Sequence, residues 1–379
     1  MNIVIVGLSI TSSWGNGHAT TYRALVRGLA SRGHRVLFLE RNASWYAENR
    51  DLPKPPYCEV QLYEHTDDLR RAHAEAIAEA DLVIVGSYVP DGVAVSDIVL
   101  RLAEGCTAFY DIDTPVTLAG LERGTSVYLD RRHIPVFDLY LSFTGGPTLE
   151  RLERQFGAPR ARALYCSFDA EVYFPEDNVR HDRDLGYLGT YSADRQPALE
   201  ALLIQPAVSW PSGRFVVAGP QYPAALSFPP NVERITHLAP RSHRRFYNRL
   251  RFTLNVTRRD MVKAGYSPSV RLFEAAACGT TIISDDWAGL GSLFAPGREI
   301  LIARGTEDVC SYLRDLSDAD RAQVGMKARE RVLQSHTSMH RAMELEGFVA
   351  EVHRERRRRT CRAERSSSAF AISETGSTT

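Results

Sequence analysis

The stretch from Gly265 to Ser284 could hold a diphosphate. Ser267 is a favourable N-cap, and Pro268 suits the first position of a helix that we expect over 268–277. The N-terminus of a helix presents free backbone N–H groups and the positive end of a dipole, and both attract phosphate. The hydroxyls of Ser267 and Ser269 could add donors.

Arg271 and Glu274 follow Ser267 at four and seven positions, on one face of the expected helix. Glu274 lies too far along the helix to contact a phosphate, but its carboxylate could accept hydrogen bonds from ribose hydroxyls. The alternative is a plain capped helix with an exposed glutamate.

Two arginines follow strand-like runs in the same half of the chain. Gly189 and Arg195 belong to the loop after the run 184–188, and Arg258 follows the run 252–256. Open α/β sheets bind ligands at the carboxyl ends of their strands, so either arginine could place a positive charge on a diphosphate. The alternative for each is an ion-paired surface arginine.

A glycine-rich loop, Gly15-Asn16-Gly17, follows the first strand and precedes His18. Its glycines permit close backbone approach to a ligand, but the loop is not a dinucleotide fingerprint because Thr20 replaces the third glycine. An imidazole with a pKa of ~6.5 suits a general base. His18 would take that role toward an acceptor hydroxyl in an inverting enzyme and would orient substrate in a retaining one. A structural histidine at a helix start is the alternative.

Asp111 and Asp113 form a D-x-D pair at the end of another strand-like run. Two such carboxylates can hold a divalent metal. We expect no metal here, because the pair lies in the half opposite the expected phosphate site. Contact with an acceptor or with the transferred group is the favoured role.

Apolar strand-like runs alternate with amphipathic helical patterns along the chain, and the pattern restarts after an irregular stretch. This alternation predicts an α/β protein with two doubly wound, Rossmann-like lobes and a cleft between them. We expect an N-terminal lobe over 1–165, a linker over 166–183, a C-terminal lobe with closing helices over 184–353, and a disordered basic and Ser/Thr-rich tail over 354–379.

Three segments of the C-terminal half together resemble group 1 glycosyltransferases, most closely the branch similar to CgeB-like spore-maturation proteins. They are LNVTRRDM from Leu254, SPSVRLFEAAACGTTIISDDW from Ser267, and His336-Thr337 with His340-Arg341. The resemblance covers most of 184–345. It implies a GT-B fold, a donor nucleotide in the C-terminal lobe, Glu274 on the ribose and an acceptor in the N-terminal lobe. The first of two glutamates common in this family falls at about Tyr266, so that acid is missing.

The resemblance implies transfer of a sugar from a nucleoside diphosphate donor, which we expect to be a UDP-sugar, to an unknown acceptor. We expect a retaining reaction without metal or cofactor. One alternative is a GT-B sugar-nucleotide epimerase. Another is a non-catalytic protein that binds a nucleotide or glycan, which the missing acid keeps open.

Composition and charge limit the kinds of binding partner that we expect. The formal net charge is zero, with 44% hydrophobic and 24% charged residues, so nothing predicts binding to nucleic acid. No run approaches the ~20 apolar residues of a membrane span, and the first residues lack the pattern of a signal peptide. Scattered cysteines agree with a cytoplasmic protein. The run Arg354–Arg359 could touch an anionic membrane surface, although a solvated tail is the favoured interpretation.

Overall fold

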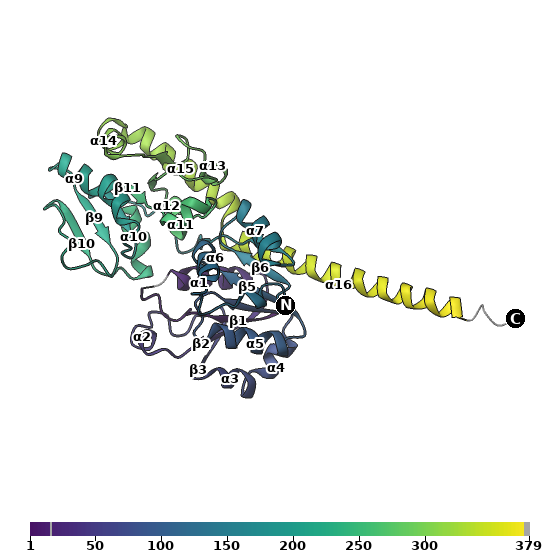
Figure 1. Ribbon diagram of the computed structural model, residues 1–379. Coiled ribbons are helices and arrows are strands. Elements are labelled where there is room, and N and C mark those ends of the chain that lie inside the picture. Colours follow the sequence, from purple (N-terminus) through teal and green to yellow (C-terminus); the bar gives the residue numbers. More distant parts are fainter. Residues whose placement is uncertain (16, 375–379) are drawn as a thin grey trace.

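The computed structural model describes residues 1–15 and 17–374, with side chains through 358. It has two α/β lobes, each with a parallel sheet covered by helices on both faces, and a long C-terminal helix that projects from the globule (Figure 1). The prediction of two Rossmann-like lobes is confirmed.

The N-terminal lobe contains parallel strands in the order β3-β2-β1-β4-β5-β6-β7. These strands are β1 (Asn2–Gly7), β2 (Arg35–Arg41), β3 (Glu59–Tyr63), β4 (Leu82–Gly86), β5 (Cys106–Asp111), β6 (Leu139–Ser142) and β7 (Ala161–Ala163). Every residue of β4 and β5 is buried, because helices cover both faces of a parallel sheet. The strand order reverses between β1 and β4, where open sheets of this kind bind ligands.

The C-terminal lobe repeats this plan in the order β10-β9-β8-β11-β12-β13. Its strands are β8 (Arg183–Leu188), β9 (Phe215–Ala218), β10 (Val232–Ile235), β11 (Leu250–Asn255), β12 (Thr281–Ser284) and β13 (Leu301–Ile302). The switch point lies between β8 and β11, so the loops that follow these two strands form the second ligand-binding edge.

Helices flank both sheets. In the N-terminal lobe they are α1 (His18–Ser31), α2 (Ser44–Ala47), α3 (Thr66–Arg71), α4 (Ala74–Glu79), α5 (Gly92–Leu102), α6 (Thr114–Arg123) and α7 (Pro147–Phe156). From residue 184 onward they are α8 (Gln196–Leu199), α9 (Gln205–Ser209), α10 (His243–Asn248), α11 (Arg259–Ala264), α12 (Val270–Ala277), α13 (Leu290–Leu293), α14 (Thr306–Asp315), α15 (Asp318–Ser335) and α16 (Ser338–Glu374). Short 3₁₀ turns at Arg131–His133 and Pro240–Ser242, and a π-helical turn at Glu200–Ile204, complete the helical elements.

The two closing helices do not both belong to the C-terminal lobe. Helix α15 packs on α12 and β12, whereas α16 returns to the N-terminal lobe and packs against α1. A β-bridge between Phe168 and Thr337 marks the place where the chain crosses between lobes in both directions. One apolar cluster therefore runs from Tyr22 of α1 and Leu345 of α16 to Phe273 of α12, and the lobes share part of their core.

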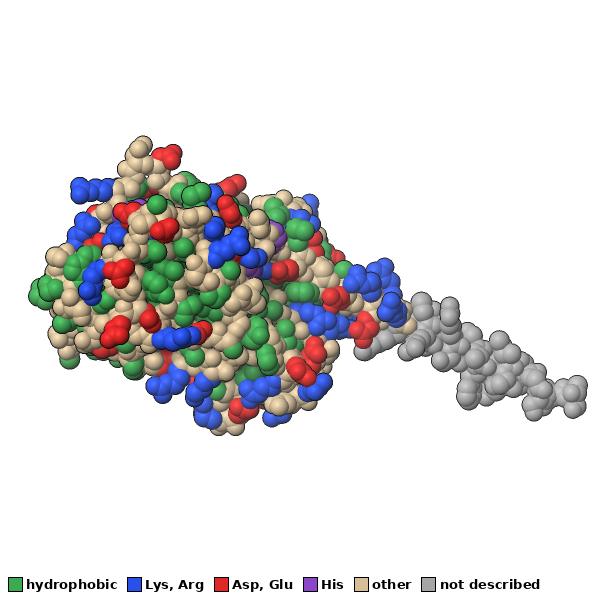
Figure 2. Space-filling model, turned by 90° about the horizontal axis from the view of Figure 1, so that it is seen from above, with side chains coloured by type: hydrophobic (Ala, Val, Ile, Leu, Met, Phe, Trp, Pro, Cys, Tyr) green, Lys and Arg blue, Asp and Glu red, His purple; other side chains and the backbone are tan. Residues whose placement is uncertain are grey.

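Helix α16 also continues through the arginine-rich run as far as Glu374. The predicted disordered tail covered 354–379, and its last residues, 375–379, lie outside the described part of the chain. Arginine, glutamate and alanine all favour helix over coil. The prediction of disorder rested on the low apolar content of the tail and did not take these helix propensities into account. Among the described helices, none combines the length and the apolar character that crossing a membrane requires. Acidic and basic side chains are interspersed over the face shown in Figure 2.

Candidate functional site

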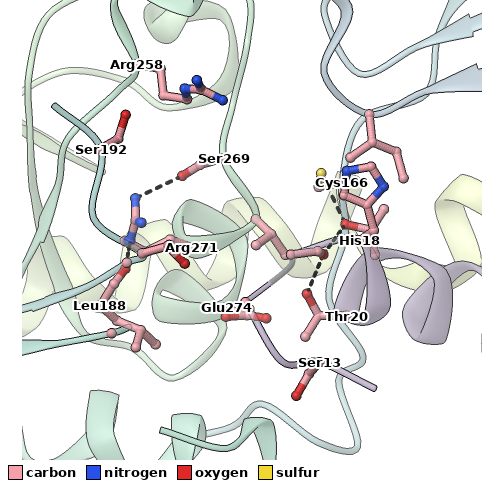
Figure 3. Close-up of a pocket in the computed structure, with 18 of the residues that line it drawn as sticks. Ser13, His18, Thr20, Cys166, Leu188, Ser192, Arg258, Ser269, Arg271 and Glu274 are labelled. Carbon is pink, nitrogen blue, oxygen red and sulfur yellow. Dashed lines mark hydrogen bonds between the residues drawn. The ribbon is translucent and has the colours of Figure 1, made fainter. Parts of the chain in front are cut away.

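A cleft of about 630 Å³ lies between the lobes, at the carboxyl ends of both sheets. Ten of the predicted site residues line it: Gly15, Gly17, His18, Asp113, Gly189, Arg195, Arg258, Ser269, Arg271 and Glu274. Figure 3 shows Arg258, Ser192, Ser269 and Arg271 on one side of this cleft and His18 with Cys166 on the other. Asn16 lies outside the described residues.

Ser269 occupies the N-cap of α12, in place of the predicted Ser267, and the helix begins at Val270. Ser267 is buried, and its hydroxyl donates to the Gly265 carbonyl at 2.8 Å and bonds the Thr144 hydroxyl at 2.9 Å. The start of α12 therefore lines the cleft with Ser269, Val270 and Arg271, and Ser267 is not part of its lining. Our placement of the helix start was two residues too early.

Asn255, at the end of β11, connects Ser269 at the N-terminus of α12 to Arg271 in the first turn of that helix. Its amide oxygen accepts hydrogen bonds from the Ser269 hydroxyl at 2.9 Å and from Arg271 at 3.0 Å. The Arg271 guanidinium also donates to the Leu188 carbonyl at 2.5 Å. Arg271 thus supports the walls of the cleft. Asn255 was not among the predicted site residues, although a polar residue at the carboxyl end of a strand beside the switch point is a usable signal.

Gly189 provides the space that Arg271 occupies. A Cβ atom at position 189 would lie 2.7 Å from Arg271 Nη2 and 2.6 Å from the Tyr187 hydroxyl. Both distances are shorter than a normal contact, so a side chain at 189 would displace the guanidinium. Gly189 lines the cleft as predicted, and its contribution is to leave space for the Arg271 guanidinium.

The other two predicted arginines have donors left over for a ligand. Arg195 donates to the Thr190 carbonyl at 2.8 Å, and its Nε atom is buried with no hydrogen-bond partner among the described residues. Arg258 precedes α11, and its Nε atom lies 3.8 Å from Asp194 and is likewise unbonded within the described part of the chain. Both side chains line the cleft. Both guanidinium groups therefore place positive charge at the wall of the cleft, which suits binding of an anion.

Glu274 lies deeper in the cleft and already has protein partners. Its carboxylate accepts hydrogen bonds from the Tyr173 hydroxyl at 2.9 Å and the Tyr247 hydroxyl at 3.4 Å, and His243 Nδ1 lies 3.6 Å away. A carboxylate has about four acceptor positions, so it can still accept from a ligand. Tyr173 is far from Glu274 in sequence, and no local pattern predicted this contact.

His18 and Asp113 meet on the N-terminal side of the cleft. His18 Nε2 lies 2.9 Å from the Asp113 carboxylate. The His18 ring packs edge-on against the Tyr88 ring, with 5.7 Å between the ring centroids. His18 is the first residue of α1, and Asp113 immediately precedes α6. The glycine loop and the second residue of the D-x-D pair thus converge on one histidine–carboxylate contact at the cleft, which could orient a hydroxyl. The other ring nitrogen of His18, Nδ1, is buried and has no hydrogen-bond partner among the described residues.

Asp111 does not reach the cleft. It is completely buried, and its carboxylate accepts hydrogen bonds from the Tyr140 hydroxyl at 2.6 Å and the Thr117 hydroxyl at 2.8 Å. It also accepts from the Asp113 backbone N–H at 3.1 Å, so it supports the turn that carries Asp113. The favoured role of Asp111 in contacting a substrate is therefore wrong. Within the described residues, no three His, Cys, Asp or Glu side chains gather as metal ligands.

Removal of the buried charge at Asp111 is expected to change how stability depends on pH. Burial raises the pKa of Asp111 to about 6, from a usual value of ~3.9. Between these values the native state binds more protons than the unfolded state, so the free energy of unfolding falls as pH rises. Asp111→Asn removes this titration, and its stability relative to the unsubstituted protein should rise by about 2 kcal/mol from pH 4 to pH 7. Urea unfolding of both proteins at the two pH values measures the change; equal differences at both would contradict it.

A model of a known protein family matches the part of the chain that contains most of the predicted donor-site residues. Residues 195–347 match the family model described as "Glycosyl transferase-like", a segment that contains Arg195, Arg258, Ser269, Arg271 and Glu274. Among curated proteins, none matches the sequence. The branch similar to CgeB-like proteins stays a prediction.

Solved structures of glycosyltransferases share the fold. Sucrose-phosphate synthase from Thermosynechococcus elongatus superposes with a TM-score of 0.66 and 15% identity, covering 93% of this chain and 99% of that one. Anabaena HepE in complex with UDP-glucose gives 0.66 and 12%, covering 93% and 100%. An alpha-glucosyltransferase in complex with UDP and a 13-mer DNA gives 0.70 and 14%, covering 92% and 99%. The chain thus has the GT-B fold, with a glycosyltransferase-like segment in its C-terminal lobe.

Proposed function

We propose that this protein is a glycosyltransferase that moves a sugar from a nucleoside diphosphate donor, a UDP-sugar, to an acceptor bound in the N-terminal lobe. The observation that carries the proposal is the convergence of Arg195, Arg258 and the N-terminus of α12 on one cleft, opposite the His18–Asp113 pair. The arginines and the start of α12 would face the departing diphosphate, and the His18–Asp113 pair would face the acceptor hydroxyl.

Charge compensation by the protein is the first part of the mechanism. Glycosyl transfer builds positive charge on the sugar ring and negative charge on the departing diphosphate. The guanidinium groups of Arg195 and Arg258 and the backbone N–H groups after Ser269 would stabilise that diphosphate. We propose that these groups do so without a metal or another cofactor. Arg271, held by Asn255 and Leu188, would keep this wall of the cleft in place.

Nucleotide recognition is the second part. HepE and the alpha-glucosyltransferase have been solved with UDP, which supports a uridine nucleotide here. Glu274 would accept hydrogen bonds from the ribose hydroxyls, with Tyr173 and His243 holding its carboxylate in position. The Glu274→Gln variant would lose the charge that strengthens these hydrogen bonds while keeping the shape of the side chain.

The stereochemical outcome is the third part. We propose retention, because a neighbour named as an alpha-glucosyltransferase binds UDP-glucose, whose glucose is itself α-linked. One observation favours inversion instead: the His18–Asp113 pair is arranged as a general base would be. NMR of the anomeric proton in the first product formed distinguishes the two outcomes. The acceptor, the absence of nucleic acid from the reaction and a cytoplasmic location stay predictions.

The proposed function is tested with a panel of nucleoside diphosphates and nucleotide sugars. A true donor at a hundred times its Kd should raise the free energy of unfolding by ~2.7 kcal/mol, seen as a thermal shift. The donor that shifts the melt should then release UDP and free sugar slowly when incubated without acceptor, and Glu274→Gln should reduce both effects. Absence of any nucleotide-dependent shift would refute the proposal, and formation of an isomeric nucleotide sugar without release would favour an epimerase.

A further inference from the structure

The ring of Tyr266 is enclosed by glycines from both lobes. A Cβ atom at Gly146, just before α7, would lie 2.4 Å from Tyr266 Cδ2, and one at Gly289, just before α13, would lie 2.4 Å from Cδ1. Any side chain at either glycine would therefore overlap the ring. Tyr266 itself has a φ of 49°, a left-handed conformation that non-glycine residues seldom adopt.

The backbone around Tyr266 joins the same two lobes. Its N–H donates to the Ala288 carbonyl at 2.6 Å in the C-terminal lobe, and its carbonyl accepts from the Gly145 N–H at 2.9 Å in the N-terminal lobe. The next residue, Ser267, bonds the Thr144 hydroxyl at 2.9 Å. Residues 144–146 and 265–267 thus form one continuous contact, called here the interlobe contact.

The interlobe contact lies beside the groups proposed to act on the donor and the acceptor. Residue 267 is two positions before Ser269, the N-cap of α12. Helix α11, which Arg258 precedes, packs against α6, which Asp113 precedes. A change in the interlobe contact would therefore shift the phosphate-binding wall relative to the His18–Asp113 pair.

We propose that Tyr266 is a positioning residue that fixes the two lobes in register, so that donor and acceptor meet at the reacting distance. The inference rests on the proposed function for its catalytic consequence, whereas the interlobe contact can be measured without any activity. The ring and the backbone make the contacts above, so the hydroxyl is dispensable. In this protein the position of the missing acid is thus used to connect the lobes.

Two substitutions test the proposal from opposite lobes. Tyr266→Gly removes the ring and tolerates the positive φ, so it does not add backbone strain. Gly146→Ala places a methyl group against the ring and disfavours the φ of 58° at that position. Tyr266→Phe is the matched control, because it keeps the ring and loses only the hydroxyl. Thermal melts establish that each variant folds.

Hydrogen exchange at the Gly145 amide gives a readout that is independent of catalysis. Its N–H bonds to the Tyr266 carbonyl, so more frequent separation of the lobes should accelerate its exchange by roughly tenfold or more in Tyr266→Gly and Gly146→Ala. Tyr266→Phe should exchange like the unsubstituted protein. Unchanged exchange in both disruptive variants would overturn the proposal.

Kinetics give the second readout. A misplacement of about 1 Å between reacting groups can cost about 100-fold in rate, so kcat should fall by that order while the Kd for UDP stays within about twofold. Tyr266→Phe should keep the kcat of the unsubstituted protein. An equal loss of UDP affinity would overturn the proposal, because it would place Tyr266 in the donor site. If the unsubstituted protein transfers no sugar, the proposed function fails, and the exchange experiment alone then decides the role of Tyr266.

Discussion

Alanine at both Arg195 and Arg258 is expected to lower kcat for sugar transfer by about 10³-fold, because removing a single pre-positioned donor at a developing charge typically costs 10²–10³-fold. Each guanidinium lines the cleft with an Nε atom that has no hydrogen-bond partner within the described residues. Both side chains are only partly buried, so the free energy of unfolding should change little. Steady-state kinetics with the donor identified by thermal shift measures the effect.

A comparison of UDP with uridine, which lacks the diphosphate, provides the sharper control. The double variant should bind UDP about tenfold or more weakly, the equivalent of one lost charge-assisted hydrogen bond, and should bind uridine unchanged, because uridine has no phosphate. Arg249→Ala is the matched control. Arg249 immediately precedes β11, at the end of that strand away from the cleft, and it pairs with Asp182. Equal weakening of UDP and uridine would contradict a role at the diphosphate.

The sequence predicted the central strands and the switch-point loops because their signals are local. Strands such as β4 and β5 are apolar throughout, since both faces are covered. The edge strand β3 was missed because its side chains are mostly exposed or partly buried and it has no apolar run. Helices α3 and α4 are separated only at Ala72 and His73; an amphipathic period continues through such a break and does not reveal it.

The candidate site was predictable to the extent that it follows strand ends. Arg195 and Arg258 line the cleft because each lies in a loop that follows a strand flanking the switch point. Ser267 was misassigned because its hydroxyl bonds Thr144, a residue 123 positions away, and this contact between lobes has no local pattern. Asp111 was misassigned for a related reason: a D-x-D pair does not show which carboxylate points into the fold, and Tyr140 and Thr117 hold the first one there.

The return of α16 to the N-terminal lobe shows the same limit on a larger scale. Arg32 on the first lobe pairs with Glu346, and Arg162 pairs with Glu351. A charged, amphipathic helix at the end of a chain can cover any sheet face that is left open. The sequence therefore predicted the helix but not the lobe on which it packs.

Loss of the His18–Asp113 pair is expected to have the second large effect. His18→Ala or Asp113→Asn should each lower kcat for transfer by about 100-fold, because the pair would position the acceptor hydroxyl for attack, while the Kd for UDP stays unchanged. The two side chains lie 2.9 Å apart at the wall of the cleft that the N-terminal lobe forms. Hydrolysis of the donor without acceptor should fall much less than transfer.

A double-mutant cycle tests whether the two residues act as a unit. If Asp113 works through its contact with His18, the double variant should be about as slow as either single variant, because residues that share one function are strongly non-additive. The same lobe has a matched pair outside the cleft lining: His133 lies 2.9 Å from Asp97. His133→Ala and Asp97→Asn should alter thermal stability but not kcat. Additive losses at His18 and Asp113 would show instead that the two residues act on different steps, and the dyad assignment would have to be given up.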